Sequence, residues 1–416
     1  MLAAPGFRAL MIAHAVCVGG YWLFLTTALT ELSSSGTAQS SRLTALLTFP
    51  LVALSPFAGL AVDRLGPRRT LLASYSGGAA VLAGLSRVDS VGGLYVGAVA
   101  LSAVIALMRP SVFGLLSRTV HPGHIGAGNA LLTAAGEGSI VLGPLVASAL
   151  IARSGNTAAF GAGAAAYGVG AVLLLRVPSP RPLARAAVTG WRGRAAELAA
   201  GARSLAADDP TRRTVVCLLA LFGFIGALFT LEPHLLSDEI GARRGSLGVV
   251  YAAAGLGSCL SALYAARRPP RLRPVPHIGL SLALVGAGTA AYSTATSLTQ
   301  AVFWNFVIGA CFGQTLPPAF SLIQRRTPGA VIGRAMAAAI ILQQASLGAV
   351  ALLVGEVLTG GVRARVLGTG VAVVIVGVAV FLTSRGRDDP APPAGSPDAG
   401  GVEQQPAVVP ELAPAP

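Results

Sequence analysis

Long apolar runs recur along nearly the whole chain and constrain its fold more than any other feature. Of the 416 residues, 54% are hydrophobic and only 11% are charged, against roughly a quarter charged in an average soluble domain. A run of about 20 apolar residues can cross a bilayer as a helix, which satisfies its backbone hydrogen bonds internally. The sequence predicts twelve membrane-spanning helices, at residues 7–31, 41–62, 69–86, 91–117, 125–152, 156–176, 213–236, 246–266, 277–296, 299–324, 331–357 and 363–384.

The basic residues indicate the orientation of these spans. All 30 are arginine, and 23 of them fall on one side if the N-terminus is cytoplasmic. Cytoplasmic loops carry such an excess of positive charge. We therefore expect a multi-pass protein of the inner (plasma) membrane with both termini in the cytoplasm. The net charge of +14 is then explained by the arginines that flank the spans on the cytoplasmic side. Nucleic-acid binding is not expected, because it would require the arginines to gather on one soluble face.

A basic connection divides the predicted spans into six and six. We expect an N-terminal six-helix bundle at 1–176, a cytoplasmic basic linker at 177–212 and a C-terminal six-helix bundle at 213–384. The Pro- and Ala-rich tail at 385–416 is expected to be disordered. Within the linker, Trp191 to Leu205 has a helix-compatible pattern that suits either the membrane surface or a solvated linker.

The two halves show weak internal similarity. A basic residue and Thr precede a Pro-Gly pair after the fourth and the tenth spans, at 115–123 and 323–329. This repeated sequence pattern indicates two pseudo-symmetric bundles. Carrying its register forward sets Glu137 of the fifth span opposite Gln343 of the eleventh.

One short motif joins the second and third spans. It reads Gly59-Leu60-Ala61-Val62-Asp63-Arg64-Leu65-Gly66-Pro67-Arg68-Arg69. The stretch resembles the G-x-x-x-D-R-x-G-R-R signature of the major facilitator superfamily, at the loop where that family carries it. The resemblance implies an all-α membrane fold of twelve helices in two pseudo-symmetric six-helix bundles. It also implies that the motif is a conformational latch, formed by Gly59, Asp63, Arg64, Gly66, Arg68 and Arg69.

Further stretches resemble the twelve-helix drug-exporter branch that includes macrolide-efflux and enterobactin-exporter proteins. They include Phe7 to Leu10, Gly19 to Trp22, Gly128 to Leu131 and Gly143-Pro144. Three positions depart from that branch: Tyr21 stands where an acid is frequent, and Ala147 and Ser148 replace glycines. The resemblance implies alternating access and transport of a small molecule.

Charged residues at bilayer depth are candidates for function, because burying a charge is expensive. Glu137 is the one acid that lies deep in a span, and Arg109 of the fourth span reaches a similar depth. The two residues can couple proton movement to transport, or they can form a buried ion pair that clamps two helices. Glu31, Glu232 and Glu356 lie near outer helix ends and are expected at the interface. His14 suits either a packed neutral group or a proton relay.

The helices expected to line a central cavity carry few polar groups and several aromatic rings. A large, mainly apolar site suits an amphipathic organic molecule. The candidate cavity residues are Tyr21, Trp22, Phe224, Phe229, Trp304, Asn305, Gln314 and Gln343.

The sequence therefore predicts a proton-coupled secondary transporter that exports a hydrophobic or amphipathic drug or natural product. The alternative is a lipid or siderophore-type exporter, or a flippase, of the same fold without proton antiport. We expect small substrate, protons and membrane lipid as partners, and a monomer. We expect no enzyme, no cofactor and no metal, because the spans lack paired carboxylates, H-E-x-x-H and a serine elbow.

Overall fold

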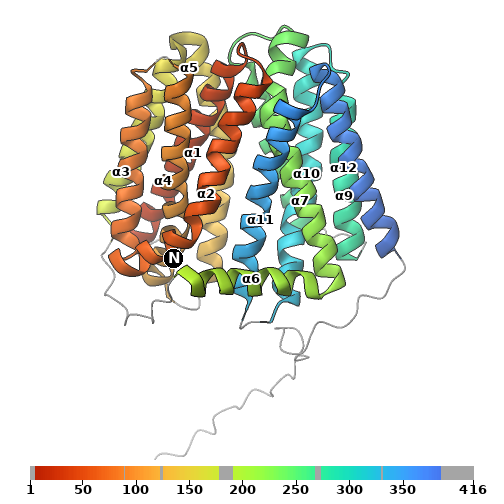
Figure 1. The fold of residues 1–416 in the computed structure, drawn as a ribbon. Coiled ribbons are helices and arrows are strands. Elements are labelled where there is room, and N and C mark those ends of the chain that lie inside the picture. Colours follow the sequence, from red (N-terminus) through yellow and green to blue (C-terminus); the bar gives the residue numbers. More distant parts are fainter. Residues whose placement is uncertain are drawn as a thin grey trace, which may run out of the picture.

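The computed structural model describes residues 5–88, 90–121, 125–177, 191–267, 273–328 and 331–385 as a bundle of long helices (Figure 1). Its elements are α1 (Pro5–Leu32), α2 (Thr37–Leu65), α3 (Pro67–Leu85), α4 (Val91–Thr119), α5 (Ile125–Leu175), α6 (Trp191–Ala207), α7 (Asp209–His234), η2 (Leu235–Glu239), α8 (Ser246–Arg267), α9 (Pro274–Tyr292), α10 (Leu298–Arg326), α11 (Ile332–Leu352), η3 (Leu353–Val357) and α12 (Val362–Ser384). The short elements η2 and η3 are π-helical turns that extend α7 and α11. Most of the predicted tail, 386–416, lies outside the described residues.

The long helix α5 consists of two antiparallel legs that meet at Gly155. This glycine has φ 78° and ψ 179°, a conformation that glycine adopts without steric cost. Gly136 of the first leg faces His14, and Gly170 of the second leg packs against Ala13 and Cys17. The two legs therefore run back along the same stretch of α1. They correspond to the separate spans expected at 125–152 and 156–176.

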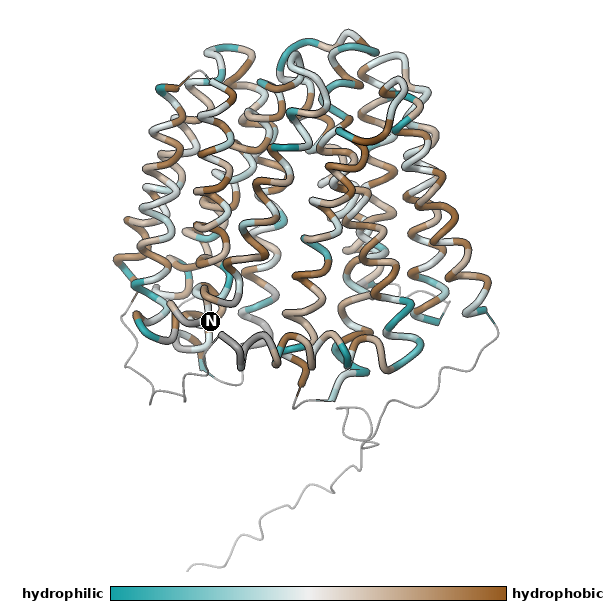
Figure 2. The backbone as a smooth tube through the Cα atoms, viewed as in Figure 1, coloured by the Kyte–Doolittle hydropathy of each residue, from teal (hydrophilic) through white to brown (hydrophobic). Residues whose placement is uncertain are grey.

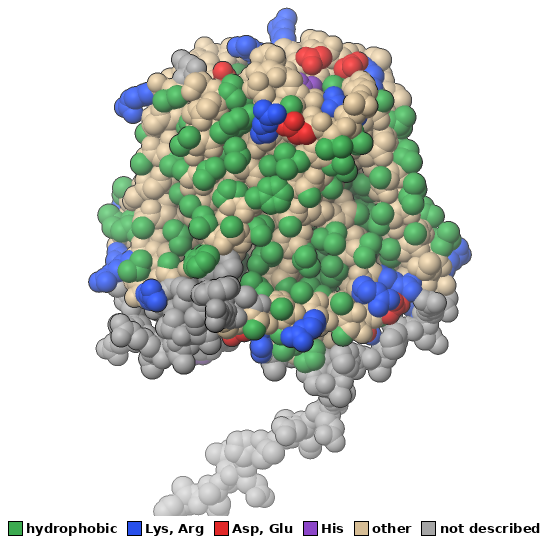
Figure 3. All heavy atoms as spheres, in the orientation of Figure 1, with side chains coloured by type: hydrophobic (Ala, Val, Ile, Leu, Met, Phe, Trp, Pro, Cys, Tyr) green, Lys and Arg blue, Asp and Glu red, His purple; other side chains and the backbone are tan. Residues whose placement is uncertain are grey.

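The hydropathy of the helices fits a membrane protein. In Figure 3, charged side chains gather toward the two ends of the bundle, and apolar side chains cover the band between them. The backbone coloured by hydropathy in Figure 2 likewise shows hydrophobic residues along the helices between these ends. Nine helices in the described residues are long and apolar enough to cross a membrane. The second leg of α5, together with α2 and α3, brings the number of bilayer-length segments in the described part to the expected twelve.

Two groups of helices stand side by side in Figure 1, with α1–α5 on the left and α7–α12 on the right. In the first group, α1 packs on both legs of α5, while α4 packs on α2 and α3. In the second group the main pairs are α9 with α12, α8 with α10, and α7 with α11. Glycines allow the closest approaches, as where Gly309 meets the backbone of Ala254 and Gly286 meets Val374. The groups meet mainly along α2–α11 and α5–α8.

The linker helix α6 lies across one end of the bundle, which we call the α6 end (Figure 1). It packs mainly on α11, where Gly201 touches the backbone of Arg334. Leu205 is buried in the same contact region, whereas Glu197 and Arg203 are exposed. One face of α6 is therefore fixed to the second group of helices, and another face remains in solvent.

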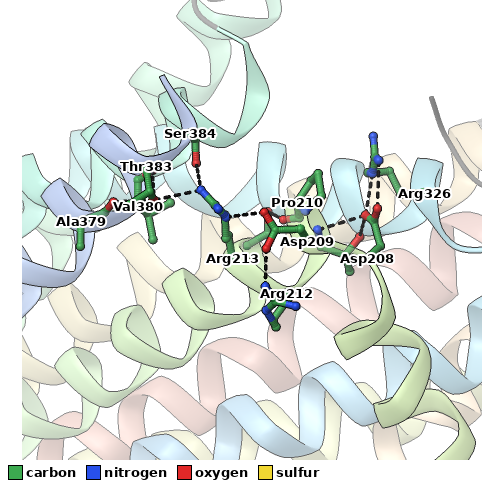
Figure 4. A network of polar contacts seen from close by, with 12 residues as sticks. Asp208, Asp209, Pro210, Arg212, Arg213, Arg326, Ala379, Val380, Thr383 and Ser384 are labelled. Atoms are coloured by element: carbon green, nitrogen blue, oxygen red, sulfur yellow. Dashed lines mark hydrogen bonds and ion pairs between the residues drawn. The ribbon is translucent and has the colours of Figure 1, made fainter. Parts of the chain in front are cut away.

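A polar network ties the start of α7 to α10 and α12 at the α6 end (Figure 4). Asp208 caps α7 by accepting from the Thr211 amide at 3.2 Å, and it accepts from Arg326 Nε and Nη2 at 2.7 and 3.0 Å. Burial alone would raise the pKa of Asp208, but the hydrogen bonds from Arg326 and Thr211 outweigh it and hold the pKa below its usual value. Asp209 pairs with Arg213, which donates to Thr383 Oγ1 of α12 at 2.9 Å.

Candidate functional site

A central cavity of about 340 Å³ lies between the two groups of helices. Its wall is mostly apolar and aromatic, with a few convergent polar groups, a composition typical of sites for organic molecules. The apolar and aromatic residues are Val18, Tyr21, Trp22, Leu25, Leu47, Leu51, Ile105, Met108, Val112, Phe113, Ile140, Phe229 and Leu347. The side chains with polar or charged groups are His14, Thr44, Thr48, Arg109, Thr133, Glu137 and Gln344.

A second crevice of about 360 Å³ continues from this cavity toward the α6 end. It runs between α2, α4 and α11 and shares Leu51, Arg109 and Gln344 with the central cavity. Glu197 and Leu198 of α6 line its mouth. The two spaces therefore form one path that leads from the middle of the bundle toward the α6 end.

The opposite end of the bundle is closed by contacts between the two groups. Arg42 pairs with Glu356, and Ser40 Oγ shares a hydrogen bond of 3.2 Å with His234 Nε2. Backbone approaches reinforce the closure, because Gly248 of α8 touches the Pro144 carbonyl of α5. The structure is therefore closed at this end and hollow toward the α6 end.

Aromatic rings form the floor of the cavity on its closed side. Trp22 of α1 lies 6.2 Å, between ring centroids, from both Phe229 of α7 and Tyr251 of α8, with edge-to-face geometry. Phe229 and Tyr251 are 5.7 Å apart. We call these three residues the aromatic seal. It joins the two groups of helices across their interface.

Both charged residues expected at depth, Glu137 and Arg109, line the central cavity and are exposed to it. They do not pair in this conformation, since neither has an ion pair or hydrogen bond among the described residues. The expected clamp between α4 and α5 is therefore absent from this conformation of the described residues. Arg109 instead interacts electrostatically with Tyr21 and His14. The cavity thus presents a carboxyl and a guanidinium that are both accessible to a ligand.

Three of the eight expected cavity residues line the cavity: Tyr21, Trp22 and Phe229. Phe224 is buried in the core, Trp304 packs against Phe303, and Gln314 donates to the Ser261 carbonyl at 2.6 Å. Asn305 is buried and donates to Glu232 Oε1 at 2.8 Å. Helix membership alone placed these residues in the cavity, but the second group packs α10 against α8 and α9, away from it.

The expected register of α11 is wrong by one position. Gln344 lines both the cavity and the crevice, whereas Gln343 is buried and its Nε2 has no hydrogen-bond partner. One residue rotates a side chain by about 100° around a helix axis. The weak repeat could not fix the position of α11 to that accuracy.

The motif between α2 and α3 forms a tight turn at the α6 end. Gly66 has φ 85° and ψ 149°, its amide donates to the Val62 carbonyl, and Pro67 begins α3. Arg68 Nη2 donates to the Leu175 carbonyl at 3.0 Å. Gly59 lines the crevice, and Arg64 and Arg69 are exposed. The side chain of Asp63 lies outside the described residues.

The sequence did not reveal a buried polar cluster around Glu232 and Asn305. Glu232, expected at the membrane interface, is fully buried. Its position near the outer end of α7 was readable from the sequence, but the covering side chains of α8, α9 and α10 come from distant positions in the chain. The described residues hold no group of three or more His, Cys, Asp or Glu that could bind a metal ion.

The sequence matches one known protein family. The family model of the Major Facilitator Superfamily matches residues 9–352. The chain belongs to this superfamily.

Two relatives are described only as uncharacterised MFS-type transporters. YfiS of Bacillus subtilis (strain 168) is 24% identical over 399 residues, covering 91% of each chain. The relative y4rN of Sinorhizobium fredii (strain NGR234) is 25% identical over 387 residues, covering 91% of this chain and 94% of its own.

Solved structures share the fold. The nucleoside transporter NupG superposes with a TM-score of 0.72 at 13% identity, covering 92% of this chain and 99% of its own. A bacterial homologue of the human lysosomal transporter Spinster, in an inward-facing conformation, gives a TM-score of 0.70 at 15% identity over 91% and 96% of the two chains. This all-helical membrane fold is that of a membrane transporter, and a cavity closed at one end suits alternating access.

Proposed function

We propose that this transporter exports a hydrophobic or amphipathic drug or natural product in exchange for protons. The observation that carries the proposal is the cavity itself, whose largely apolar wall contains one unpaired acid, Glu137, and one unpaired base, Arg109. An apolar wall favours organic molecules with few hydroxyl groups, since each buried hydroxyl requires a hydrogen-bond partner. Resemblance to the drug-exporter branch supports the same substrate class.

In this proposal the α6 end faces the cytoplasm of the cell membrane. The arginine excess supports that orientation, which makes the described conformation inward-facing. Helices α1–α5 and α7–α12 then act as the two rocking units of a monomer, joined through the linker that contains α6. The motif from Gly59 to Arg69 lies at the α6 end, where it would latch the inner side when that side closes.

Glu137 is the proposed coupling residue. In the open cavity its carboxyl can exchange a proton with water, and a cationic substrate group or Arg109 can take the place of the proton. Substrate and proton then compete for one site, so that binding of one accompanies release of the other, which is the requirement for antiport.

The test is efflux in a host that lacks its own exporters, with a panel of apolar toxic compounds. Expression should lower the accumulation of at least one compound, and dissipating the proton gradient should restore it. Glu137→Gln should abolish pH-driven transport but leave substrate binding measurable. A matched control is Glu31→Gln, which changes an exposed acid at the closed end. If no compound changes its accumulation, the exporter proposal fails.

A second candidate is a lipid or siderophore-type exporter, or flippase, without proton antiport. The crevice between α2 and α11 favours it, because its apolar walls include Val52, Ile340 and Ile341 and lead to the guanidinium of Arg109. An acyl chain could follow such a path while an acidic head group pairs with Arg109. Movement of a labelled lipid that persists without a proton gradient would favour this candidate over antiport.

A further inference from the structure

Glu232 of α7 is an acid buried completely inside the second group of helices. Its Oε1 accepts a hydrogen bond of 2.8 Å from Asn305 Nδ2 of α10. Its other oxygen, Oε2, is buried without a hydrogen-bond partner. The site is on the closed side of the central cavity, because Glu232 follows the aromatic seal residue Phe229 by one helical turn.

Two tyrosines from other helices face the same carboxyl. Tyr251 of α8 and Tyr292 of α9 both interact with it electrostatically. The hydroxyl of Tyr292 lies close enough to act, like Asn305, as a donor to the carboxyl, and the hydroxyl of Tyr251 is buried without a hydrogen-bond partner. The carboxyl of Glu232 and the hydroxyls of two tyrosines thus form one buried polar cluster.

The basic side chains close to this end of the bundle pair with groups other than Glu232. His234, on the same helix, contacts Ser40 of α2 and Asp238. Arg363 of α12 pairs with Glu239 and donates to the carbonyls of Ser293 and Ala295, and Arg365 donates to Thr37 and the Val354 carbonyl. Among the described residues, none of them pairs with Glu232.

These contacts favour the neutral form of the carboxyl. A buried carboxylate without a cation, and with one oxygen lacking a donor, is strongly unfavourable. A protonated Oε2 becomes a donor, for which the hydroxyls of Tyr292 and Tyr251 are the neighbouring acceptors. Protonation therefore removes a buried charge that no cation compensates.

Tyr251 connects this carboxyl to the interface between the helix groups. Its ring packs on Trp22 and Phe229 within the aromatic seal, and its hydroxyl interacts electrostatically with Glu232. A change of charge on Glu232 would recruit water and donors toward the carboxyl. Such a change would act on Tyr251 first and, through it, on the contact with α1.

We propose that Glu232 is a proton-binding site, separate from Glu137, that must be protonated before the aromatic seal can close. When the closed end opens, the carboxyl becomes hydrated and gives its proton to water, leaving a carboxylate. Rebinding of a proton from the same side allows Tyr251 to pack again on Trp22. The inference adds a gate to the alternating access of the proposed function, but it depends on neither the substrate nor Glu137.

The test measures conformation rather than transport. Spin labels at Ser35→Cys and Thr359→Cys, exposed positions on the two groups at the closed end, report its opening in lipid nanodiscs. The four native cysteines are replaced by alanine. In the otherwise unchanged chain the ratio of open to closed molecules should rise with pH, by at most about tenfold per pH unit, the slope of one linked proton.

The isosteric change Glu232→Gln mimics the protonated acid. It should keep the end closed across the pH range, while the matched control Glu31→Gln, which changes an exposed acid at the same end, should retain the pH response. Retention of the full response by Glu232→Gln would overturn the proposal. If that variant does not fold, infrared spectra of Tyr251→Phe and the unchanged chain decide instead. A carboxylic-acid carbonyl band at neutral pH that shifts in the variant supports the proposal, and its absence from both overturns it.

Discussion

Arg42 of α2 holds Glu356 of η3 in a two-point ion pair, with Nε–Oε1 at 2.6 Å and Nη2–Oε2 at 3.2 Å. The pair joins the two groups of helices at the end away from α6. Beside it, Arg365 donates to Thr37 Oγ1 at 3.0 Å, a second link between the groups. Because Arg42 is half exposed, the pair contributes little to folding, but it exists only while this end is closed.

Arg42→Gln should therefore open the closed end without unfolding the protein. We expect a shift of about two- to fivefold in the ratio of open to closed molecules, the range for an exposed ion pair. Distances between labels across this end measure the shift. Arg87→Gln is the matched control, because Arg87 is also exposed but its guanidinium donates to the Ala83 carbonyl of the preceding helix α3, within one group of helices. Exchanging the charges with Arg42→Glu and Glu356→Arg should restore closure, and failure to do so would contradict the role of the pair.

Gly248 of α8 packs directly against α5. A Cβ at this position would meet the Pro144 carbonyl and Ser148 Oγ. Gly248→Val should therefore prevent the α5–α8 approach, shift the protein toward the conformation open at this end and stop transport. Gly168→Val is the control, since nothing lies within 4 Å of a Cβ there. Normal transport by a folded Gly248→Val variant would show that closure does not need this contact.

The overall architecture was readable from the sequence because a membrane span depends on local properties. Length, hydropathy and the positions of arginine predict the spans, and the chain reversal at Gly155 separates two of them as expected. The motif that joins the second and third spans was also identified from the sequence, and its Gly66 has positive φ at the end of α2. These features require only short stretches of chain.

The sequence predicted less accurately which side chains face the cavity. Which face of a helix lines the cavity depends on its rotation and on its neighbours. Gln343 and Gln344 differ by one position, yet only Gln344 reaches the cavity. Glu232 lies near a helix end, but Asn305 and Tyr292 cover it from helices more than one span away in the sequence. Such tertiary contacts leave no local pattern.

Gln344 and Gln343 provide a test of the register of α11. Gln344→Ala removes a polar group from the cavity wall and should change transport or substrate preference while leaving stability unchanged. Gln343→Ala removes a buried amide whose Nε2 lacks a partner, so it should alter thermal stability with little effect on substrate preference. Apparent affinities and melting temperatures of the two variants distinguish these effects. The reverse pattern would show that Gln343 faces the substrate.

Asp208 should stabilise the second helix group in a pH-dependent manner. Asp208→Ala removes the N-cap of α7 and the partner of Arg326, for an expected loss of about 1–2 kcal/mol. Asp208→Asn keeps a capping oxygen and should lose less. Because the pKa of Asp208 is lower in the folded protein than its usual value, its stabilisation is present at neutral pH and is lost as the pH falls through the folded value.

Thermal unfolding of the purified protein in detergent measures this dependence. The difference in Tm between the unchanged chain and Asp208→Asn should be largest near neutral pH and should shrink below about pH 4, where the acid begins to take up a proton. Asp209→Asn is the matched control, since Asp209 has a more exposed side chain and pairs with its own helix neighbours Arg212 and Arg213. A Tm difference for Asp208→Asn that stayed constant into acid would show that the charge on Asp208 contributes nothing, and that its stabilising role comes from the cap alone.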